Sequence, residues 1–422
     1  MLCWDDADPL LANELAPDYI RPDYNGYCFA NVPATIGSLL DVDLGGPMLP
    51  SAVFENVQTD VETVVVVLVD GFGFEQWDRH SDVGFFNRLT NRVAVTPLTS
   101  VYPSETAAAM STYMTARTPI EHGLIGWNVY LKEHDTVIES LPFQTKDKED
   151  AGEVLGADPD RLRTGMSVFE QFDANGVETW RIAPESIVGS DPADVPFTPV
   201  PYDAFDTFSA GLCDAVRAAD SGFVHAYLPQ IDTAAHEHGT EANEYRETLT
   251  EIAAALEQSL IEGLDDESAE RTVLIVTADH GHVDTEGNIA LLEFDTVRES
   301  IGMDTSGTPL LGGGPRNVHL YLDGADSTRV RDDLTAELED ARDADALVLT
   351  REDAREEGLF GPGEPSETFL RQCGDVLVIP KESNMWHSGE RVELEYVGMH
   401  GGLHPDEQLI PFAAVRLDAL RG

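Results

Sequence analysis

The stretch VVVVLVDG, residues 64–71, decides the fold of this chain. Its six consecutive Val and Leu residues are typical of a parallel strand that is buried on both faces. The strand ends at Asp70, beside Gly71. Because ligands bind at the carboxyl ends of strands in open α/β sheets, Asp70 is the first candidate for a functional residue.

Strands and helices alternate along the rest of the chain, which predicts an α/β fold. Strands are expected over 93–98, 180–183, 223–228 and 273–277, and helices over 106–116, 166–172 and 244–261. This alternation indicates a doubly wound, mostly parallel sheet with helices on both faces. The segment before residue 50 is rich in Pro, Asp and Gly, and we expect it to lie as an extended lead-in on the core.

The composition of the chain changes near Arg316, which predicts a smaller α+β insertion. A strand over 317–322, an acidic helix over 328–342 and strands over 346–350 and 375–379 form a compact series. We therefore expect one catalytic domain, residues 1–422, that carries this insertion over 316–397. The preceding GGGPR, residues 312–316, is interpreted as a turn into the insertion.

The charge of the chain is strongly acidic. Asp and Glu number 78 against 26 Lys and Arg, which gives a net charge of -52. A basic partner is one interpretation, but acids spread over many helices favour a solvated surface suited to molar salt, where charges are screened within about 3 Å. We therefore expect a halophilic source. The same charge argues against a duplex nucleic-acid partner, because phosphate backbones are bound by clustered Lys and Arg.

The four cysteines support neither a zinc ribbon nor a thioredoxin-like motif. They are widely spaced and form no CxxC pair: Cys3, Cys28, Cys213 and Cys373. Free thiols in a reducing compartment are expected. The acidic N-terminus lacks the pattern of a signal peptide, and no apolar run approaches the roughly 20 residues that span a bilayer. These features predict a cytoplasmic protein without a membrane partner.

Polar clusters follow several predicted strands and can be gathered at one edge of the sheet. Their carboxylate and imidazole groups are Asp70, Asp232, His236, Asp279, His280 and His400. Asp232 and His236 are four residues apart, a spacing that places both on one face of a helix. Carboxylate and imidazole groups together can hold two divalent metal ions, and this mixture of O and N ligands favours zinc, with manganese as an alternative.

Three other histidines compete with these candidates. His238 is the alternative to His236, and His404 is the alternative to His400, although His404 looks more like a helix start. His282 lies close to His280 and could donate a hydrogen bond to a metal ligand or to the substrate.

A hydroxyl group at a helix start completes the candidate site. Thr106 opens an Ala-rich stretch, where free N–H groups and the helix dipole favour an anion. A Thr hydroxyl needs a metal or a base to become a nucleophile. Ser104 is the alternative nucleophile, but it is better placed to cap the helix.

VDG, the hydroxyl at the helix start, DxxxH, DHG and a late HGG, in this order, resemble the alkaline phosphatase superfamily. The closest likeness is to its type I phosphodiesterase/nucleotide pyrophosphatase branch, over about 64–412. The resemblance implies one metal held by Asp232, His236 and His400. It implies a second metal held by Asp70, Asp279 and His280, with Thr106 as the nucleophile beside it. Asn128 stands one residue later than the Asn that binds a phosphate oxygen in this branch, and is the candidate substrate-binding residue.

The function that this resemblance implies is hydrolysis of a small, nucleotide-like phosphodiester through a phospho-threonine intermediate. A phosphomonoesterase and a metal-dependent phosphomutase of the same superfamily are the alternatives, and Arg117, Arg181 and Arg316 are candidates for a phosphate clamp. Sulfatase activity is not supported, because the helix start lacks the Cys/Ser-x-Pro/Ala-x-Arg pattern. A non-catalytic phosphate-binding protein is the alternative of another class.

Overall fold

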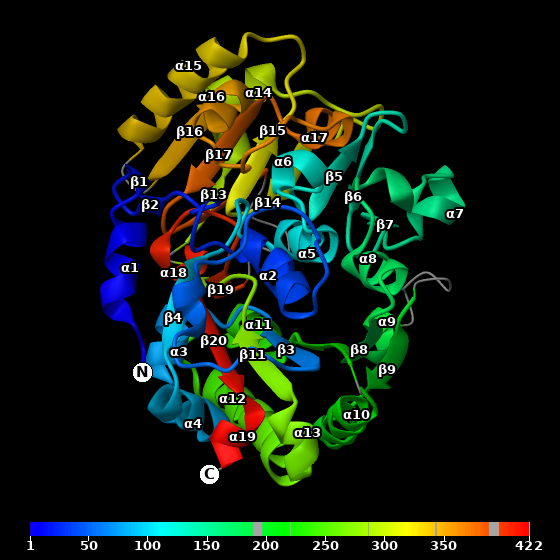
Figure 1. Ribbon diagram of the computed structural model, residues 1–422. Coiled ribbons are helices and arrows are strands. Elements are labelled where there is room, and N and C mark those ends of the chain that lie inside the picture. The colour runs from blue at the N-terminus through cyan, green and yellow to red at the C-terminus, as the bar shows by residue number, and fades with distance from the viewer. Residues whose placement is uncertain (189–195, 220, 286, 342–343, 388–395, 422) are drawn as a thin grey trace.

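The computed structural model describes residues 1–188, 196–219, 221–285, 287–341, 344–387 and 396–421. It contains two seven-stranded sheets, one in the lower and one in the upper half of Figure 1. In the described residues, no helix has both the length and the apolar character needed to cross a membrane.

The first sheet has the order β4-β20-β11-β3-β10-β8-β9. Its strands are β3 (Thr63–Val69), β4 (Val95–Thr99), β8 (Glu178–Pro184), β9 (Thr198–Tyr202), β10 (Gly222–Leu228), β11 (Thr272–Thr277) and β20 (Leu409–Arg416). β11, β3, β10, β8 and β9 are parallel neighbours, whereas β20 runs antiparallel to both β11 and β4. The sheet is therefore mostly parallel, as the sequence predicts.

Helices cover both faces of this sheet (Figure 1). On one side lie α2 (Val32–Leu39), α5 (Thr106–Thr115) and α8 (Val168–Ala174), and on the other lie α4 (Gly84–Arg92), α10 (Phe205–Ala218) and α12 (Asn243–Leu256). Phe223 and His225 of β10 pack against α8 and α5, with ring centroids 5.1 Å from Phe172 and 5.2 Å from Tyr113. Every residue of β3 is buried, which explains the uninterrupted apolar run that opens the fold.

Shorter helices complete this half of the molecule. They are α1 (Trp4–Leu11), α3 (Phe74–Arg79), α6 (Pro119–His122), α9 (Glu185–Val188), α11 (Gln230–His238), α13 (Asp266–Glu270), α18 (Pro405–Gln408) and α19 (Leu417–Arg421). A π-helical stretch, Glu257–Glu262, continues α12. The four cysteines are free.

The second sheet is antiparallel and has the order β16-β17-β15-β14-β5-β6-β7. Its strands are β5 (Asn128–Leu131), β6 (Thr136–Glu139), β7 (Gln144–Thr145), β14 (Leu311–Gly314), β15 (Asn317–Leu320), β16 (Ala346–Thr350) and β17 (Val376–Pro380). Its helices are α7 (Ala151–Leu155), α14 (Asp295–Ser300), α15 (Ser327–Asp340), α16 (Arg351–Glu356) and α17 (Glu367–Gln372). Apolar side chains of α14, α15 and strands β14 to β17 form a separate core.

Two features of the second sheet differ from the expectations. Strands β5 to β7 come from a stretch far upstream of the expected insertion, residues 316–397. The residues interpreted as a turn form strand β14, and the turn itself is confined to Pro315 and Arg316. Residues 342–343 and 388–395 of the expected insertion lie outside the described residues.

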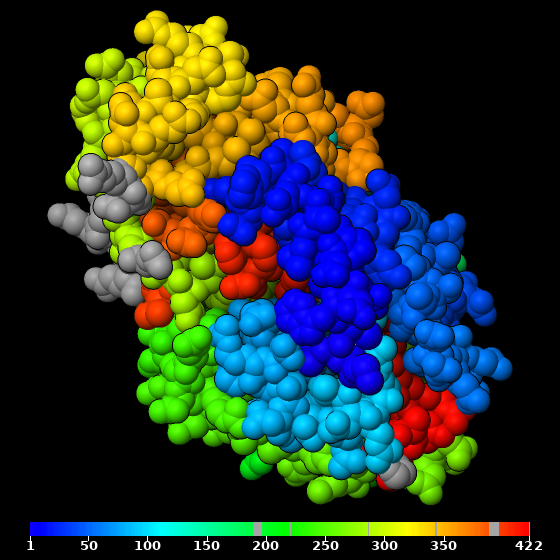
Figure 2. Space-filling model, turned by 90° about the vertical axis from the view of Figure 1, so that its left-hand side faces the viewer, coloured from blue at the N-terminus to red at the C-terminus, as the bar shows by residue number. Residues whose placement is uncertain are grey.

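Three small two-stranded pairs lie outside the two large sheets in the described residues, and the N-terminal segment reaches both halves. The pairs are β1 (Glu14–Ala16) with β2 (Tyr19–Ile20), β12 (Val283–Asp284) with β19 (Gly398–Met399), and β13 (Asn288–Ala290) with β18 (Asn384–Trp386). Figure 2 shows the N-terminal residues, in blue, lying over the surface from the second sheet to the first. The backbone N–H of Ile20 donates to the carbonyl of Leu403, and that of Thr99 donates to Tyr27.

Candidate active site

The candidate residues meet at the carboxyl edge of the first sheet. Asp70 follows β3, Asp279 and His280 follow β11, and the β10 strand leads into α11, which carries Asp232 and His236. Because β3 lies between β11 and β10, the carboxyl ends of these three strands are neighbours. Thr106 at the first position of α5 and His400 directly after β19 complete the group.

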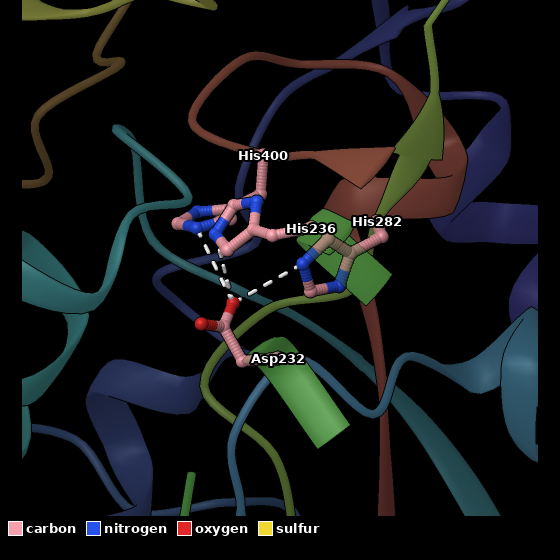
Figure 3. A group of neighbouring side chains, drawn as sticks. All are labelled: Asp232, His236, His282 and His400. Carbon is pink, nitrogen blue, oxygen red and sulfur yellow. Dashed lines mark ion pairs between the residues drawn. The ribbon is translucent and has the colours of Figure 1, made fainter. Parts of the chain in front are cut away.

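One cluster is centred on Asp232 (Figure 3). Its Oδ1 lies 3.1 Å from Nε2 of His282, 3.4 Å from Nε2 of His236 and 3.5 Å from Nε2 of His400. The three imidazoles come from different segments and point toward this one carboxylate. Their ligand atoms lie within 4.8 Å of one another, so the four residues can hold a metal ion.

A second cluster lies beside the first. Nε2 of His280 lies 3.2 Å from Oδ1 of Asp70, 3.6 Å from Oδ2 of Asp279 and 3.0 Å from Oγ1 of Thr106. Asp70, His280 and Asp232 can hold a metal ion together, so Asp232 belongs to both clusters. The rings of His280 and His400 stack with centroids 3.6 Å apart, which brings the two clusters into contact.

Backbone carbonyls orient all four imidazoles. Nδ1 lies 2.7 Å from Gly398 O in His236, 3.1 Å from Gly281 O in His280, 3.0 Å from Gly71 O in His282 and 3.1 Å from Ser104 O in His400. A ring nitrogen that faces a carbonyl must donate a proton, and Nε2 is then the atom that faces the cluster. This is the arrangement in which backbone groups hold metal-ligating histidines.

Close packing at Gly71 supports this orientation. Gly71 has a φ of +71°, and a Cβ there would lie 2.3 Å from the His282 ring. Only glycine is compatible with both the backbone conformation and the approach of the imidazole. The turn after β3 therefore fixes His282 as well as Asp70.

The electrostatics of the cluster show an excess of buried negative charge. Burial lowers the pKa of His280, but the neighbouring Asp279 and Asp70 outweigh this effect and raise it to about 10. Burial and the charge of Asp70 raise the pKa of Asp279 well above its usual range. Burial and the charge of His280 lower the pKa of His400. The carboxylates therefore favour a cation at this position.

Unpaired atoms point to the same conclusion. Oδ1 of Asp70, Oδ1 of Asp232, Oδ2 of Asp279 and Nε2 of His282 are buried and form no hydrogen bond within the described residues, although each lies in one of the carboxylate–imidazole pairs at 3.1 to 3.6 Å. Unpaired buried carboxylate oxygens are unfavourable, and coordination of a cation satisfies them. The residues present thus fit divalent metal ions. The other oxygen of Asp70 accepts a hydrogen bond from the hydroxyl of Tyr227, which leaves Oδ1 facing His280.

Most of the competing candidates have other partners. Ser104 is fully buried, donates to Gly402 O and accepts from Gly401 N–H. His404 caps α18 through a hydrogen bond from Asp406 N–H. His238 is exposed and lies beside Glu237. His282, by contrast, is a full member of the first cluster, and its H-x-H spacing from His280 is the sequence signal that could have ranked it higher.

The candidate substrate-binding residues outside the cluster are used differently. Asn128 donates from Nδ2 to Gly313 O, and its Oδ1 accepts from Lys146, so both polar atoms bind within the second sheet. The assignment of Arg316 to a phosphate clamp is wrong in this structure, because its guanidinium is fully buried and paired with Glu407. Arg117 is exposed at the end of α5.

Comparison with known proteins identifies the family. The profile of the type I phosphodiesterase/nucleotide pyrophosphatase family matches residues 64–403. No curated protein matches the chain in sequence. The chain therefore belongs to the type I phosphodiesterase/nucleotide pyrophosphatase family. It is a phosphoester hydrolase of the alkaline phosphatase superfamily, which confirms the resemblance seen in the sequence motifs.

Solved structures share the fold at low sequence identity. An inactive variant of murine ectonucleotide pyrophosphatase/phosphodiesterase 5, in complex with AMP, is 14% identical with a TM-score of 0.62, covering 83% of this chain and 87% of that chain. The human protein is 15% identical, with a TM-score of 0.59 and the same coverage. Phosphonoacetate hydrolase from Sinorhizobium meliloti 1021, in complex with phosphonoformate, is 18% identical with a TM-score of 0.59, covering 86% of this chain and 95% of that chain.

Proposed function

We propose that this protein is a metal-dependent phosphodiesterase or nucleotide pyrophosphatase that cleaves a small, nucleotide-like phosphodiester through a phospho-threonine intermediate. The single observation that carries the proposal is the position of Thr106. Its hydroxyl is partly exposed at the first turn of α5 and lies 3.0 Å from Nε2 of His280, inside the second cluster. Ser104, the alternative nucleophile, is buried and hydrogen-bonded to the HGG loop.

The residues that would hold the cofactor follow from the two clusters. Asp232, His236 and His400, with His282 beside them, would hold one divalent ion. Asp70, Asp279 and His280 would hold the other, next to Thr106. Imidazole and carboxylate ligands together favour zinc, with manganese as the alternative. When bound, these cations supply Lewis-acid charge that lowers the pKa of the Thr106 hydroxyl and offsets charge on the leaving group.

The chemistry then proceeds in two displacements at phosphorus. Oγ1 of Thr106 gives up its proton to solvent and attacks the phosphorus atom. The bond from phosphorus to the leaving oxygen breaks, the leaving group departs and takes up a proton from solvent, and the phosphoryl group with its remaining ester substituent stays on Thr106. Water attacks from the opposite side and releases it. No side chain caps the N-terminus of α5 in the described residues, and the N–H groups of its first turn would stabilise negative charge on a group transferred to Thr106.

A trapping experiment tests the intermediate. Protein quenched in acid during turnover of bis-p-nitrophenyl phosphate should carry the transferred phosphoryl group on the peptide that contains Thr106, as seen by mass spectrometry. Thr106→Ala should keep its metal content but lose the adduct and turnover. Thr115→Ala is the matched control, because Thr115 is on the same helix and its hydroxyl binds Ser111 O. Equal hydrolysis by wild type and Thr106→Ala would rule out the covalent route.

A second comparison separates the proposed activity from its rivals. The rates with bis-p-nitrophenyl phosphate and p-nitrophenyl phosphate should favour the diester. Strong preference for the monoester would make the protein a phosphomonoesterase instead. Transfer within a sugar phosphate, with little hydrolysis, would make it a phosphomutase.

A further inference from the structure

Glu105, the residue before the proposed nucleophile, is a buried acid that the proposed mechanism does not use. It occupies the N-cap position of α5 with an extended backbone, but its side chain does not cap the helix. The residue is 5% exposed. Glutamate is among the residues least often buried without a partner.

The carboxyl of Glu105 is held at one oxygen and unpaired at the other. Oε1 accepts a hydrogen bond from the backbone N–H of Trp127 at 2.6 Å. Oε2 is buried and has no hydrogen-bond partner among the residues that the structure describes. In the described residues, no Lys or Arg forms an ion pair with this carboxyl. An unpaired buried carboxylate oxygen destabilises the fold, so the residue needs an explanation other than packing.

The carboxyl lies at the border of the candidate active site. Burial raises the pKa of Glu105, and the charge of His280, whose Nε2 is 3.0 Å from the Thr106 hydroxyl, opposes this shift. On its other side lies strand β14 of the second sheet, where a Cβ on Gly314 would come within 3.3 Å of Oε1. A glycine strand, the turn at Trp127 and the nucleophile helix thus enclose the side chain. Its free oxygen therefore belongs to the residue directly before the proposed nucleophile, at the start of α5.

The carboxylate of Glu105 changes the net charge of the candidate active site. While the Thr106 hydroxyl keeps its proton, two divalent cations would exceed the three aspartates, Asp70, Asp232 and Asp279, by one positive charge. Ionised Glu105 cancels that charge. In the described residues, the ion pairs of the three aspartates involve only histidines, and Arg316 is occupied by Glu407. No arginine of the described cluster therefore compensates a second negative charge on the substrate.

We propose that Glu105 is a specificity-determining residue that selects substrates whose transferred phosphoryl group carries a single negative charge. Phosphodiesters and substituted pyrophosphates have such a group, whereas a phosphomonoester carries close to two charges above about pH 6. This inference rests on the proposed function, and it assigns the substrate class of the same site.

The test compares wild type with Glu105→Gln, which keeps the shape and can still accept from Trp127 N–H. kcat/KM is measured for bis-p-nitrophenyl phosphate and p-nitrophenyl phosphate at about pH 8.5, above the pKa of about 7 that burial gives Glu105. At an effective dielectric of about 20, removal of a unit charge several ångströms away changes a rate by about ten- to a hundredfold. The ratio of diester to monoester kcat/KM should fall by about that factor, mainly through faster monoester cleavage.

Glu337→Gln is the matched control, because Glu337 also accepts a backbone N–H, that of Thr296, but belongs to α15 of the second sheet. Its ratio should equal that of wild type. Calorimetric titration with inorganic phosphate adds a reading that does not depend on turnover, and phosphate should bind more tightly to Glu105→Gln. If this variant fails to fold, Glu105→Leu is the second neutral variant, with the same expected result.

A ratio and a phosphate affinity within twofold of wild type would overturn the inference, as would equal losses on both esters. Failure of the proposed function looks different: wild type would then cleave neither ester, or Thr106→Ala would be as active as wild type. In that case the phosphate titration alone decides the role of Glu105.

Discussion

The buried ion pair between Arg316 and Glu407 allows a quantitative prediction, because both side chains are fully excluded from solvent. The guanidinium donates to Glu407 at 2.7 and 3.2 Å, and also to the carbonyls of Ser383 and Lys381 at 3.0 and 2.7 Å. Arg316→Met leaves an uncompensated carboxylate in the interior. Removal of one partner of such a pair costs about 3–5 kcal/mol.

The same pair stabilises the loop that carries His400. Glu407 accepts hydrogen bonds from the backbone N–H groups of Gly402 and His404, at 3.0 and 3.1 Å. Arg316→Met should therefore weaken metal retention as well as stability. The double variant Arg316→Met/Glu407→Leu removes both charges and should recover most of the lost free energy of unfolding.

Urea unfolding of metal-free protein, followed by circular dichroism, measures these differences. Arg331→Met is the matched control, because Arg331 pairs with Asp353 at 2.7 Å in the same half of the molecule but both side chains remain partly exposed. That variant should lose less than about 1 kcal/mol. A loss below about 1 kcal/mol in Arg316→Met, together with a large fall in kcat/KM, would refute this account and restore Arg316 as a substrate clamp.

Three further predictions follow from charge and burial. Burial raises the pKa of Glu105 to about 7, so the free energy of unfolding of metal-free wild type should fall by up to about 3 kcal/mol relative to Glu105→Gln as pH rises from about 4.5 to 7. Urea unfolding at several pH values measures this difference, and a difference that stays constant with pH would contradict the prediction. Tyr227→Phe removes the hydrogen bond to Oδ2 of Asp70 and should weaken metal binding about 10- to 100-fold, as measured by competition with a chelator. An unchanged affinity would exclude a role of Tyr227 in positioning Asp70. We propose that the net charge of -52 reflects adaptation to salt. The melting temperature should therefore be higher in about 2 M KCl than in about 0.1 M KCl, because the Debye length falls from about 10 Å to a few Å; equal melting temperatures would contradict the proposed adaptation.

The sequence predicted the parts of the fold that depend on local pattern. The Val/Leu run before Asp70 and the apolar stretch before Asp279 reveal buried parallel strands, and the ends of such strands must lie near one another. The spacing of Asp232 and His236 places both on one helix face, as α11 shows. These patterns lie within short segments of the chain, so they can be recognised in a single sequence.

Long-range pairing explains what the sequence did not predict. Strand β14 pairs with β5 across nearly two hundred residues, and neither strand carries a signal for its partner. The Arg316–Glu407 pair likewise joins residues far apart, so an arginine beside glycines resembled a phosphate ligand. The approach of His282 to Asp232 depends on the turn at Gly71, so the sequence predicts only a supporting role for this histidine.

The most direct test of the account is the metal content of the purified protein and of single-site variants. After reconstitution with zinc and removal of excess ion, inductively coupled plasma mass spectrometry should find about two ions per chain in wild type. His236→Ala and Asp70→Asn should each retain about one, because these residues belong to different clusters, whereas His238→Ala, on the same helix as His236, should retain two. Fewer than one ion per chain in wild type, or equal losses in His236→Ala and His238→Ala, would contradict the paired metal site.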